Sequence, residues 1–472
     1  MYNCDVVQKT VMSTITPKSY RLYLRYWFGQ NISIVGSAIV MFTIIWKMAD
    51  LVGNNNTELS IVFFLNFLPQ IIIYPIAGVI ADKFNKKRII LISDSMQALL
   101  TLILILFLVY MDFRLWQFYI FNFLRTVCQV FHNSVSYTLI PIFVPKEKIT
   151  RINGMNFLSQ NLSNIVAGPI AVFLMLFFDF RTILWLDILT FCIALIPLLK
   201  LSFPTDLQEK ASECENAPNM KNTENRSSME HFPTKEPLSS KSQESLLAEY
   251  KSGFAIIKKV PGLLTLILML MVTNFVFRPF ETLKINFIKY SHGGTEIEYS
   301  FFTTAHQIGT FIGALFVSLK KTYKHWNRCL YIGMVSTACC WLMLSLIPSG
   351  EFIFLYLTVF FLHILNPLVN TLLMSVFQLN VSKENLGKAI SIMIALCSLL
   401  QPFGCLISGP ISDRLGFLSI VKLNITLDSI QALYLISALI NITIISLILK
   451  TPKITHLLKR SEKLASNHLD TL

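Results

Sequence analysis

Charged side chains are scarce in this sequence. Asp, Glu, Lys and Arg together make up 14% of its 472 residues, whereas a soluble domain carries about a quarter. Apolar residues reach 54%. The length alone would allow two or three soluble domains, but this composition excludes them and indicates a membrane protein.

Signatures of catalysis and of cofactor binding are also missing. The nine cysteines are scattered, with no CxxC and no Cys/His ligand spacing, so we predict neither a disulfide framework nor a metal site. The sequence has no glycine loop of the Walker type, which argues against ATP as an energy source. No nucleophile–base set stands out. We therefore expect a protein that is not an enzyme and that needs no cofactor.

Long apolar blocks are what the sequence does contain. Each has about 18 residues or more, the length that crosses about 30 Å of hydrocarbon. The block at 182–201 is the weakest, because it contains Asp187. The first 25 residues show no signal-peptide pattern, so the first block should act as its own insertion signal. The twelve predicted spans are 26–46, 58–80, 89–111, 115–142, 153–178, 182–201, 261–287, 299–318, 329–347, 352–378, 389–411 and 429–450.

Lysine and arginine are distributed unevenly among the connecting segments. If the N-terminus is inside, the cytoplasmic segments hold 31 of the 40 Lys and Arg residues, the external segments six and the spans three. This asymmetry predicts that both termini lie in the cytoplasm. The net charge of +13 then needs no nucleic-acid partner, and the lipid bilayer is the partner we expect.

Weak internal repeats divide the spans into two groups of six. Residues 144–155 are similar to residues 381–392, and the spans on either side follow the same order. Such duplication predicts an all-α membrane protein of two pseudo-symmetric six-helix halves. Residues 203–250 are rich in Ser, Glu, Lys, Asn and Pro, which is typical of a disordered linker. The predicted division is a cytoplasmic segment 1–25, a half 26–202, a linker 203–250, a half 251–450 with a leading interfacial helix, and a cytoplasmic tail 451–472.

A basic loop at 78–88, Gly-Val-Ile-Ala-Asp-Lys-Phe-Asn-Lys-Lys-Arg, separates the second and third spans. It resembles the loop between helices 2 and 3 of the major facilitator superfamily, although Lys83 and Asn85 stand where Arg and Gly are common. The resemblance implies that Asp82 latches the two halves by facing the start of span 11; a loop that only sets topology is the alternative. The residues that carry this motif are Gly78, Asp82, Lys83, Lys86, Lys87 and Arg88.

Three other stretches, at 22–37, around Asp94 and at 144–151, resemble the macrolide-efflux branch of this family and its siderophore-exporter relatives. The resemblance implies a monomeric, proton-driven exporter of amphipathic small molecules, macrolide-like or siderophore-like, in a bacterial plasma membrane. Two alternatives stay open. One is a facilitator that imports a small nutrient, and the other is a membrane sensor or scaffold that transports nothing.

Arg125 lies about 15 Å deep in the fourth span, near the membrane midplane. A charge at that depth needs a partner or a wet cavity. Asp94 is the acid we expect to pair with Arg125 or with the loop cations. The resemblance implies proton coupling for such an arginine, while a purely structural role is equally compatible. Gln30 and Asn31 should face inward from the first span, because amides in lipid also need partners.

The second half offers fewer polar groups. Arg278 and Glu281 stand at i,i+3 in the seventh span and can form a local ion pair. His363 lies in the tenth span, where the repeat offset and its depth place it level with Arg125. We therefore predict that Arg125 and His363 line one transport path, although a lone histidine in a span is more often structural.

Two Gly-Pro pairs occupy equivalent places in the two halves. Gly168-Pro169 lies in the fifth span and Gly409-Pro410 in the eleventh. The first pair partly resembles the antiporter motif of the family. A simple helix kink is the interpretation we favour for both pairs.

Overall fold

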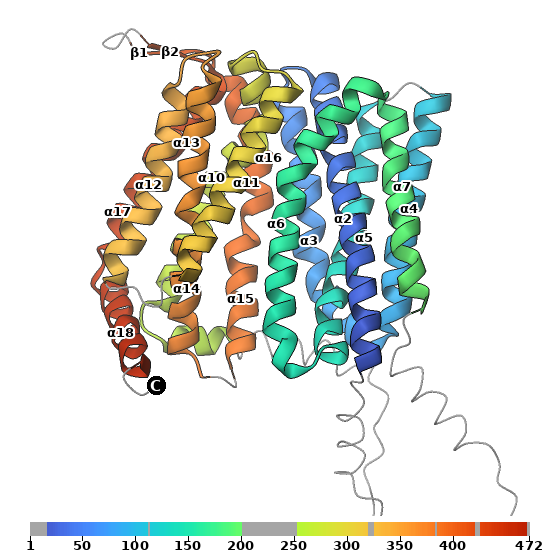
Figure 1. Ribbon diagram of the computed structural model, residues 1–472. Helices are drawn as coiled ribbons and strands as arrows, with labels where there is room; N and C mark the ends of the chain where they lie inside the picture. Colours follow the sequence, from blue (N-terminus) through green and yellow to red (C-terminus); the bar gives the residue numbers. More distant parts are fainter. Residues whose placement is uncertain are drawn as a thin grey trace, which may run out of the picture.

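A computed structural model describes residues 17–111, 114–200, 253–319, 325–382, 385–420 and 425–469. In these ranges the chain forms a bundle of long helices that run roughly along one axis (Figure 1). Two short strands, β1 (Leu418–Ile420) and β2 (Ile425–Leu427), pair antiparallel at one end of the bundle. The predicted linker 203–250 lies outside the described residues.

Six helices build the first half, which is coloured blue to green in Figure 1. They are α2 (Pro17–Val52), α3 (Asn56–Lys83), α4 (Lys86–Tyr110), α5 (Leu115–Phe143), α6 (Lys146–Phe177) and α7 (Phe180–Lys200). Asparagine side chains begin two of them. Asn55 accepts a hydrogen bond from the Glu58 amide at the start of α3, and Asn85 accepts one from the Arg88 amide at the start of α4. Such caps satisfy amides that have no partner inside the helix.

Six passes also build the described second half. They are α10 (Leu263–Asn286) with the π-helical turn η1 (Phe287–Ser291), α11 (Glu296–Leu319), α12 (Trp326–Leu346), α13 (Phe352–Ile364) with α14 (Asn366–Asn380), α15 (Leu386–Leu399) with α16 (Gln401–Leu415), and α17 (Ser429–Leu449). Two of the predicted spans are therefore broken, at Leu365 and at Leu400. Pro367 and Pro402 follow these breaks; proline lacks the amide that would continue the helix.

Eleven segments of the described chain are long and apolar enough to cross a membrane. The pass that is not among them is α5, which carries several polar side chains and packs against α3 and α4 inside the bundle. Large apolar side chains such as Phe173, Phe177 and Trp185 are exposed on α6 and α7, while Arg125 and Asp187 are buried. Apolar groups outside and polar groups inside suit a bundle in lipid. The predicted fold, an all-α membrane protein of two six-helix halves, is confirmed.

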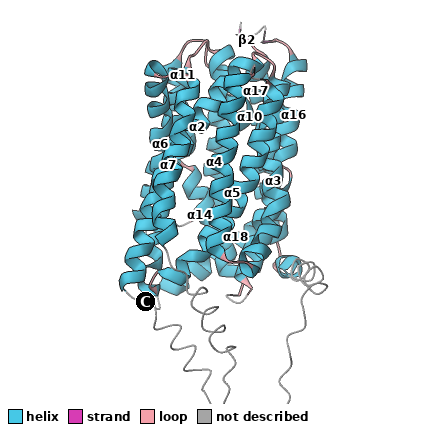
Figure 2. Cartoon of the chain, turned by 90° about the vertical axis from the view of Figure 1, so that its right-hand side faces the viewer, coloured by secondary structure: helices cyan, strands magenta, loops and turns pink. Residues whose placement is uncertain are grey.

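The two ends of the bundle differ. We call the end with α18 (Pro452–Leu469) and the turn between α3 and α4 the basic face, and the end with the β1–β2 hairpin the opposite face (Figures 1 and 2). The sequence predicts no more than a cytoplasmic tail for residues 451–472. In the structure, α18 packs Ile454, Leu457 and Leu458 against the second half, and Glu462 accepts a hydrogen bond from the His325 amide.

The halves contact each other near the opposite face. The Asp413 carboxylate at the end of α16 accepts hydrogen bonds from the Asn56 amide at 3.2 Å and from the Thr57 amide at 2.9 Å, at the start of α3. Asn286 at the end of α10 donates to the Asn56 side chain at 2.9 Å. An acid at the end of one helix thus meets the N-terminus of another, which carries partial positive charge.

Glycines allow this close approach. A Cβ atom added at Gly409 would overlap the carbonyl oxygen of Asn56, and one at Gly168 would press on Ser300 and Thr303 of α11. Pro169 and Pro410 lie inside continuous helices. Both Gly-Pro pairs therefore sit where the first and second halves pack together.

Candidate functional site

A polar cavity of about 390 Å³ opens among the helices of the first half. Five helices, α2 to α6, contribute its lining, and most of the lining side chains are amides, hydroxyls or charged groups. The predicted residues Gln30, Asp94 and Arg125 are brought together here. The lining residues are Gln30, Ser33, Ile34, Ser37, Ala38, Met41, Asn66, Gln70, Asp94, Gln97, Asn122, Arg125, Thr126, Gln129, His132, Asn133, Gln160 and Asn164.

Arg125 is held by Asp187 of α7 rather than by Asp94, so the pairing suggested from sequence is wrong. One guanidinium nitrogen lies 2.8 Å from Asp187 Oδ2, and a second lies 3.4 Å from Oδ1. Ser37 and Thr101 donate to the two oxygens of the same carboxylate, at 2.6 and 2.7 Å. Both charged side chains are less than a tenth exposed.

This network joins α2, α4, α5 and α7 at one point. Burying two charges is tolerated only when the pair is close and the remaining hydrogen-bonding capacity is used, and both conditions hold. The charge of Asp187 lowers the hydropathy of its span. The structure explains why the acid is there: a buried counter-charge for Arg125 has to come from within a span. Arg125 thus stands at the wall of the cavity with its charge matched by Asp187.

Asp94 pairs instead with a histidine that we did not single out. His132 Nδ1 lies 2.6 Å from Asp94 Oδ1, and the Gln30 amide donates to the other oxygen at 3.2 Å. Asp94 and His132 each keep about a tenth of their side chains exposed to the cavity. Tyr26 and Cys128 lie within electrostatic reach of Asp94. A carboxylate and an imidazole in this contact can hold or release one proton.

Asn31 does not line the cavity. Its side chain donates to the Trp27 carbonyl at 2.6 Å and accepts from Ser159 of α6. Nearer the basic face, Lys87 donates to the Leu199 carbonyl at 2.9 Å, and Arg88 is exposed. The side chains of the motif residues Asp82 and Lys83, and the surroundings of Gly78, lie outside the described part of the chain.

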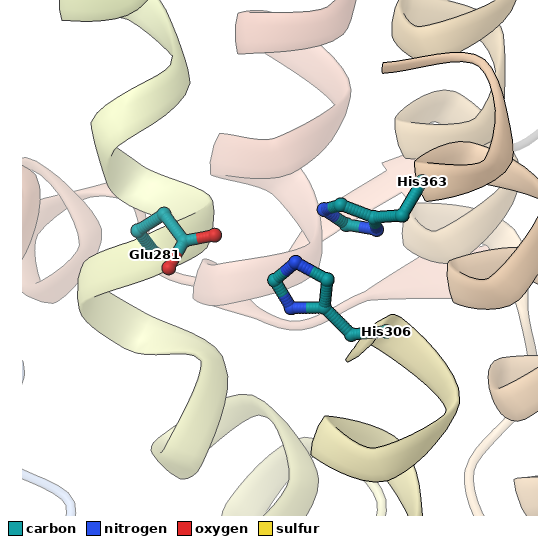
Figure 3. A group of neighbouring side chains, drawn as sticks. All are labelled: Glu281, His306 and His363. Atoms are coloured by element: carbon teal, nitrogen blue, oxygen red, sulfur yellow. The ribbon is translucent and has the colours of Figure 1, made fainter. Parts of the chain in front are cut away.

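A second polar cluster lies inside the second half. The Glu281 carboxylate accepts from Lys284 Nζ at 3.0 Å, so the local ion pair is with Lys284 and not with Arg278. The Arg278 guanidinium instead lies over the Phe67 ring of α3, 4.8 Å from its centre. His363 is buried beside His306, with ring centres 3.5 Å apart. Figure 3 shows both imidazoles and the Glu281 carboxylate converging from three helices.

Residues 26–404 match the sequence profile of the Major Facilitator Superfamily. The chain belongs to this superfamily. Macrolide efflux protein A of Streptococcus pyogenes is 24% identical to this facilitator over 390 residues, which cover 83% of the chain and 89% of the relative. Macrolide efflux protein A of Enterococcus faecalis is 24% identical over 341 residues, 72% of the chain and 96% of the relative.

Solved structures of other facilitators share the fold. The nucleoside transporter NupG superposes with a TM-score of 0.57 at 13% identity, over 90% of this chain and 98% of that one. The peptide transporter POT in complex with sulfate gives 0.63 at 11% identity, over 95% and 96%. These structures show the fold, and membership of the superfamily shows the role: the protein is a multi-pass membrane transporter of small substrates and not an enzyme.

The sequence points to three of the eighteen residues that line this facilitator's cavity, Gln30, Asp94 and Arg125, and not to the others. Arg125, Gln129 and His132 recur at i, i+4 and i+7 on one face of α5, and this spacing could have revealed His132. In the sequence, Asp187 only lowers the hydropathy of the span at 182–201. The sequence alone cannot show that His306 meets His363. Among the described residues, His363 is not part of the lining of the cavity that contains Arg125.

Proposed function

We propose that this facilitator exports amphipathic small molecules across a bacterial plasma membrane, driven by protons, with both termini and the basic face in the cytoplasm. The named relatives support efflux, and their alignment covers most of both chains. The excess of Lys and Arg in the loops of the basic face supports the orientation. The domain boundaries given above, and action as a monomer, belong to the same proposal.

The cavity of the first half is the proposed substrate site. A volume of about 390 Å³ falls in the range of small-molecule pockets. Amide side chains such as Gln70, Asn122 and Gln160 offer both donors and acceptors, while Met41 and Ile34 offer apolar contact. This mixture suits an amphipathic molecule, macrolide-like or siderophore-like, better than a small ion.

The Asp94–His132 pair is the proposed coupling site, and its contact at 2.6 Å on the cavity wall is the observation that carries the proposal. Arg125 already has a full counter-charge in Asp187, so the acid free to exchange a proton for substrate is Asp94. A proton that enters from outside would neutralise Asp94 and release the substrate. Its departure to the cytoplasm would restore the charge and the site.

Drug accumulation in cells tests this function. Cells that express the protein should accumulate less macrolide than empty cells, and a protonophore should remove the difference. Asp94→Asn should abolish efflux while the protein stays in the membrane. His456→Gln, which changes an exposed histidine on α18, serves as the control and should export normally. Export that persists with the protonophore present, or in Asp94→Asn, would contradict proton coupling at this pair.

A further inference from the structure

Glu281, His306 and His363 form a compact group of metal-binding side chains that the transport proposal does not use. One ligand atom from each lies within 4.8 Å of the other two. They come from α10, α11 and α13, and Figure 3 shows all three side chains pointing at a common space. No sequence spacing revealed the group, because each ligand stands on a different helix.

The orientation of His363 favours metal binding. Its Nδ1 lies 2.9 Å from the Val359 carbonyl, and a carbonyl only accepts, so Nδ1 carries the hydrogen. The lone pair is then on Nε2. A backbone carbonyl that fixes the second nitrogen is the usual support of a metal-binding histidine. His363 is 1% exposed and cannot turn to water instead.

His306 supplies the second nitrogen. Its ring lies 3.5 Å from that of His363, centre to centre, and makes no hydrogen bond within the described ranges. Two imidazoles this close cannot both carry a positive charge away from water, and the neutral ring is the form that binds metal. Ligand atoms around a tetrahedral ion lie about 3.4 Å apart, so the three ligand atoms, within 4.8 Å of one another, must draw closer and the two rings must turn apart when an ion binds.

Lys284 opposes a bound cation, and this opposition makes the inference testable. Its ammonium group lies 3.0 Å from Glu281 Oε2, which leaves Oε1 free to act as a ligand. Arg278, three residues before Glu281, adds a second positive charge nearby. Both charges lower the affinity for a divalent ion without blocking the ligand atoms. Removal of the Lys284 charge must therefore strengthen binding at a real metal site.

We propose that Glu281, His306 and His363 bind a divalent transition-metal ion such as Zn²⁺ or Co²⁺. Two histidine nitrogens and one carboxylate oxygen are a ligand set that suits these ions, with a fourth position for water. The bound ion ties α10, α11 and α13 together, and its ligand His363 stands two residues before the break at Leu365. Metal binding is a property of the second half and stands apart from the proton coupling proposed for the first half.

Cobalt titration of the purified full chain, without a histidine tag and in nanodiscs, tests the site. The wild type should bind one Co²⁺ per chain with visible absorption, and Zn²⁺ should displace it. His306→Ala, His363→Ala and Glu281→Gln should each weaken binding about tenfold or more. His456→Gln, the exposed-histidine control, should bind as the wild type does.

A fifth variant, Lys284→Met, should bind Co²⁺ several-fold more tightly, a gain that misfolding cannot produce. The proposal is overturned if the wild type shows no displaceable Co²⁺ absorption up to millimolar metal. It is equally overturned if both histidine variants keep wild-type affinity, or if Lys284→Met binds no better than the wild type.

Discussion

Arg125 and Asp187 form a buried ion pair across α5 and α7, with 2.8 Å between the guanidinium nitrogen and the carboxylate oxygen. Removing one partner leaves the other charged and buried, which costs about 3–5 kcal/mol. Arg125→Ala should therefore destabilise the protein and stop efflux. Replacing both residues, as in Arg125→Leu with Asp187→Leu, should recover much of the stability. Thermal unfolding in detergent measures both changes.

The double replacement also separates structure from coupling. If Arg125 only supports the cavity wall, the double variant should regain part of the efflux along with its stability. The double variant could instead be as stable as the wild type and export nothing under any proton gradient. Arg125 would then take a direct part in transport and would not be purely structural.

The predictable part of this protein is the part that lipid dictates. Span lengths, loop charges and the two-half repeat follow from hydrocarbon thickness and duplication, so the fold was predicted from sequence. Pairings inside the bundle were not predictable, because only the packing of the helices decides whether Asp94 or Asp187 lies closer to Arg125. The pairing of Glu281 was not predictable for the same reason. Arg278 lies three residues before it and Lys284 three residues after it on α10, and only the structure shows that Lys284 is the partner.

Helix breaks were partly predictable. Asn366-Pro367 and Gln401-Pro402 were inside continuous apolar runs, and hydropathy alone joined each pair of segments into one span. The helix α18 was missed for another reason. Its apolar residues recur at helical spacing but are too few for a span, and their burial depends on packing against α12 and α14.

Asp413 should control opening at the opposite face. Its carboxylate accepts from the Asn56 and Thr57 amides at the start of α3, and hydrogen bonds to a charged group contribute about 1.5–3 kcal/mol. Asp413→Asn should weaken this contact between the halves. A cysteine at the buried position Ser60 should then react several-fold faster with a membrane-impermeant maleimide.

The matched control is Asp428→Asn. Asp428 caps α17 within the second half, near the same face, and its carboxylate makes no hydrogen bond or ion pair across the halves among the described residues. Labelling at position 60 should stay at the wild-type rate in this control. Equal acceleration in the two variants would mean that general loosening, and not the contact of Asp413 with α3, exposes the site.

Gly409 should be required for the halves to close. An added methyl group would overlap the backbone carbonyl of Asn56, and backbone cannot move aside as a flexible side chain can. Gly409→Ala should therefore reach the membrane but lose transport, with raised labelling at position 60. Gly154→Ala, on an exposed face of α6 with nothing within 4 Å of the new atom, should transport normally. Normal efflux by Gly409→Ala would show that the halves need not approach this closely.

His292, in the turn between η1 and α11, should make stability depend on pH. Burial, including an edge-on contact with the Phe287 ring at 4.6 Å, lowers the pKa of His292 from 6.5 to about 4. Between pH 6.5 and 4 the folded protein binds fewer protons at His292 than the unfolded chain does. Above about pH 6.5 both states are neutral here, so His292 does not lower the free energy of unfolding. Between pH 6.5 and 4 the cost grows by about 1.4 kcal/mol for each unit of acidification. The midpoint temperature of thermal unfolding should fall less steeply with decreasing pH in His292→Gln than in the wild type. Parallel plots of this temperature against pH for the two proteins would contradict the low pKa of His292.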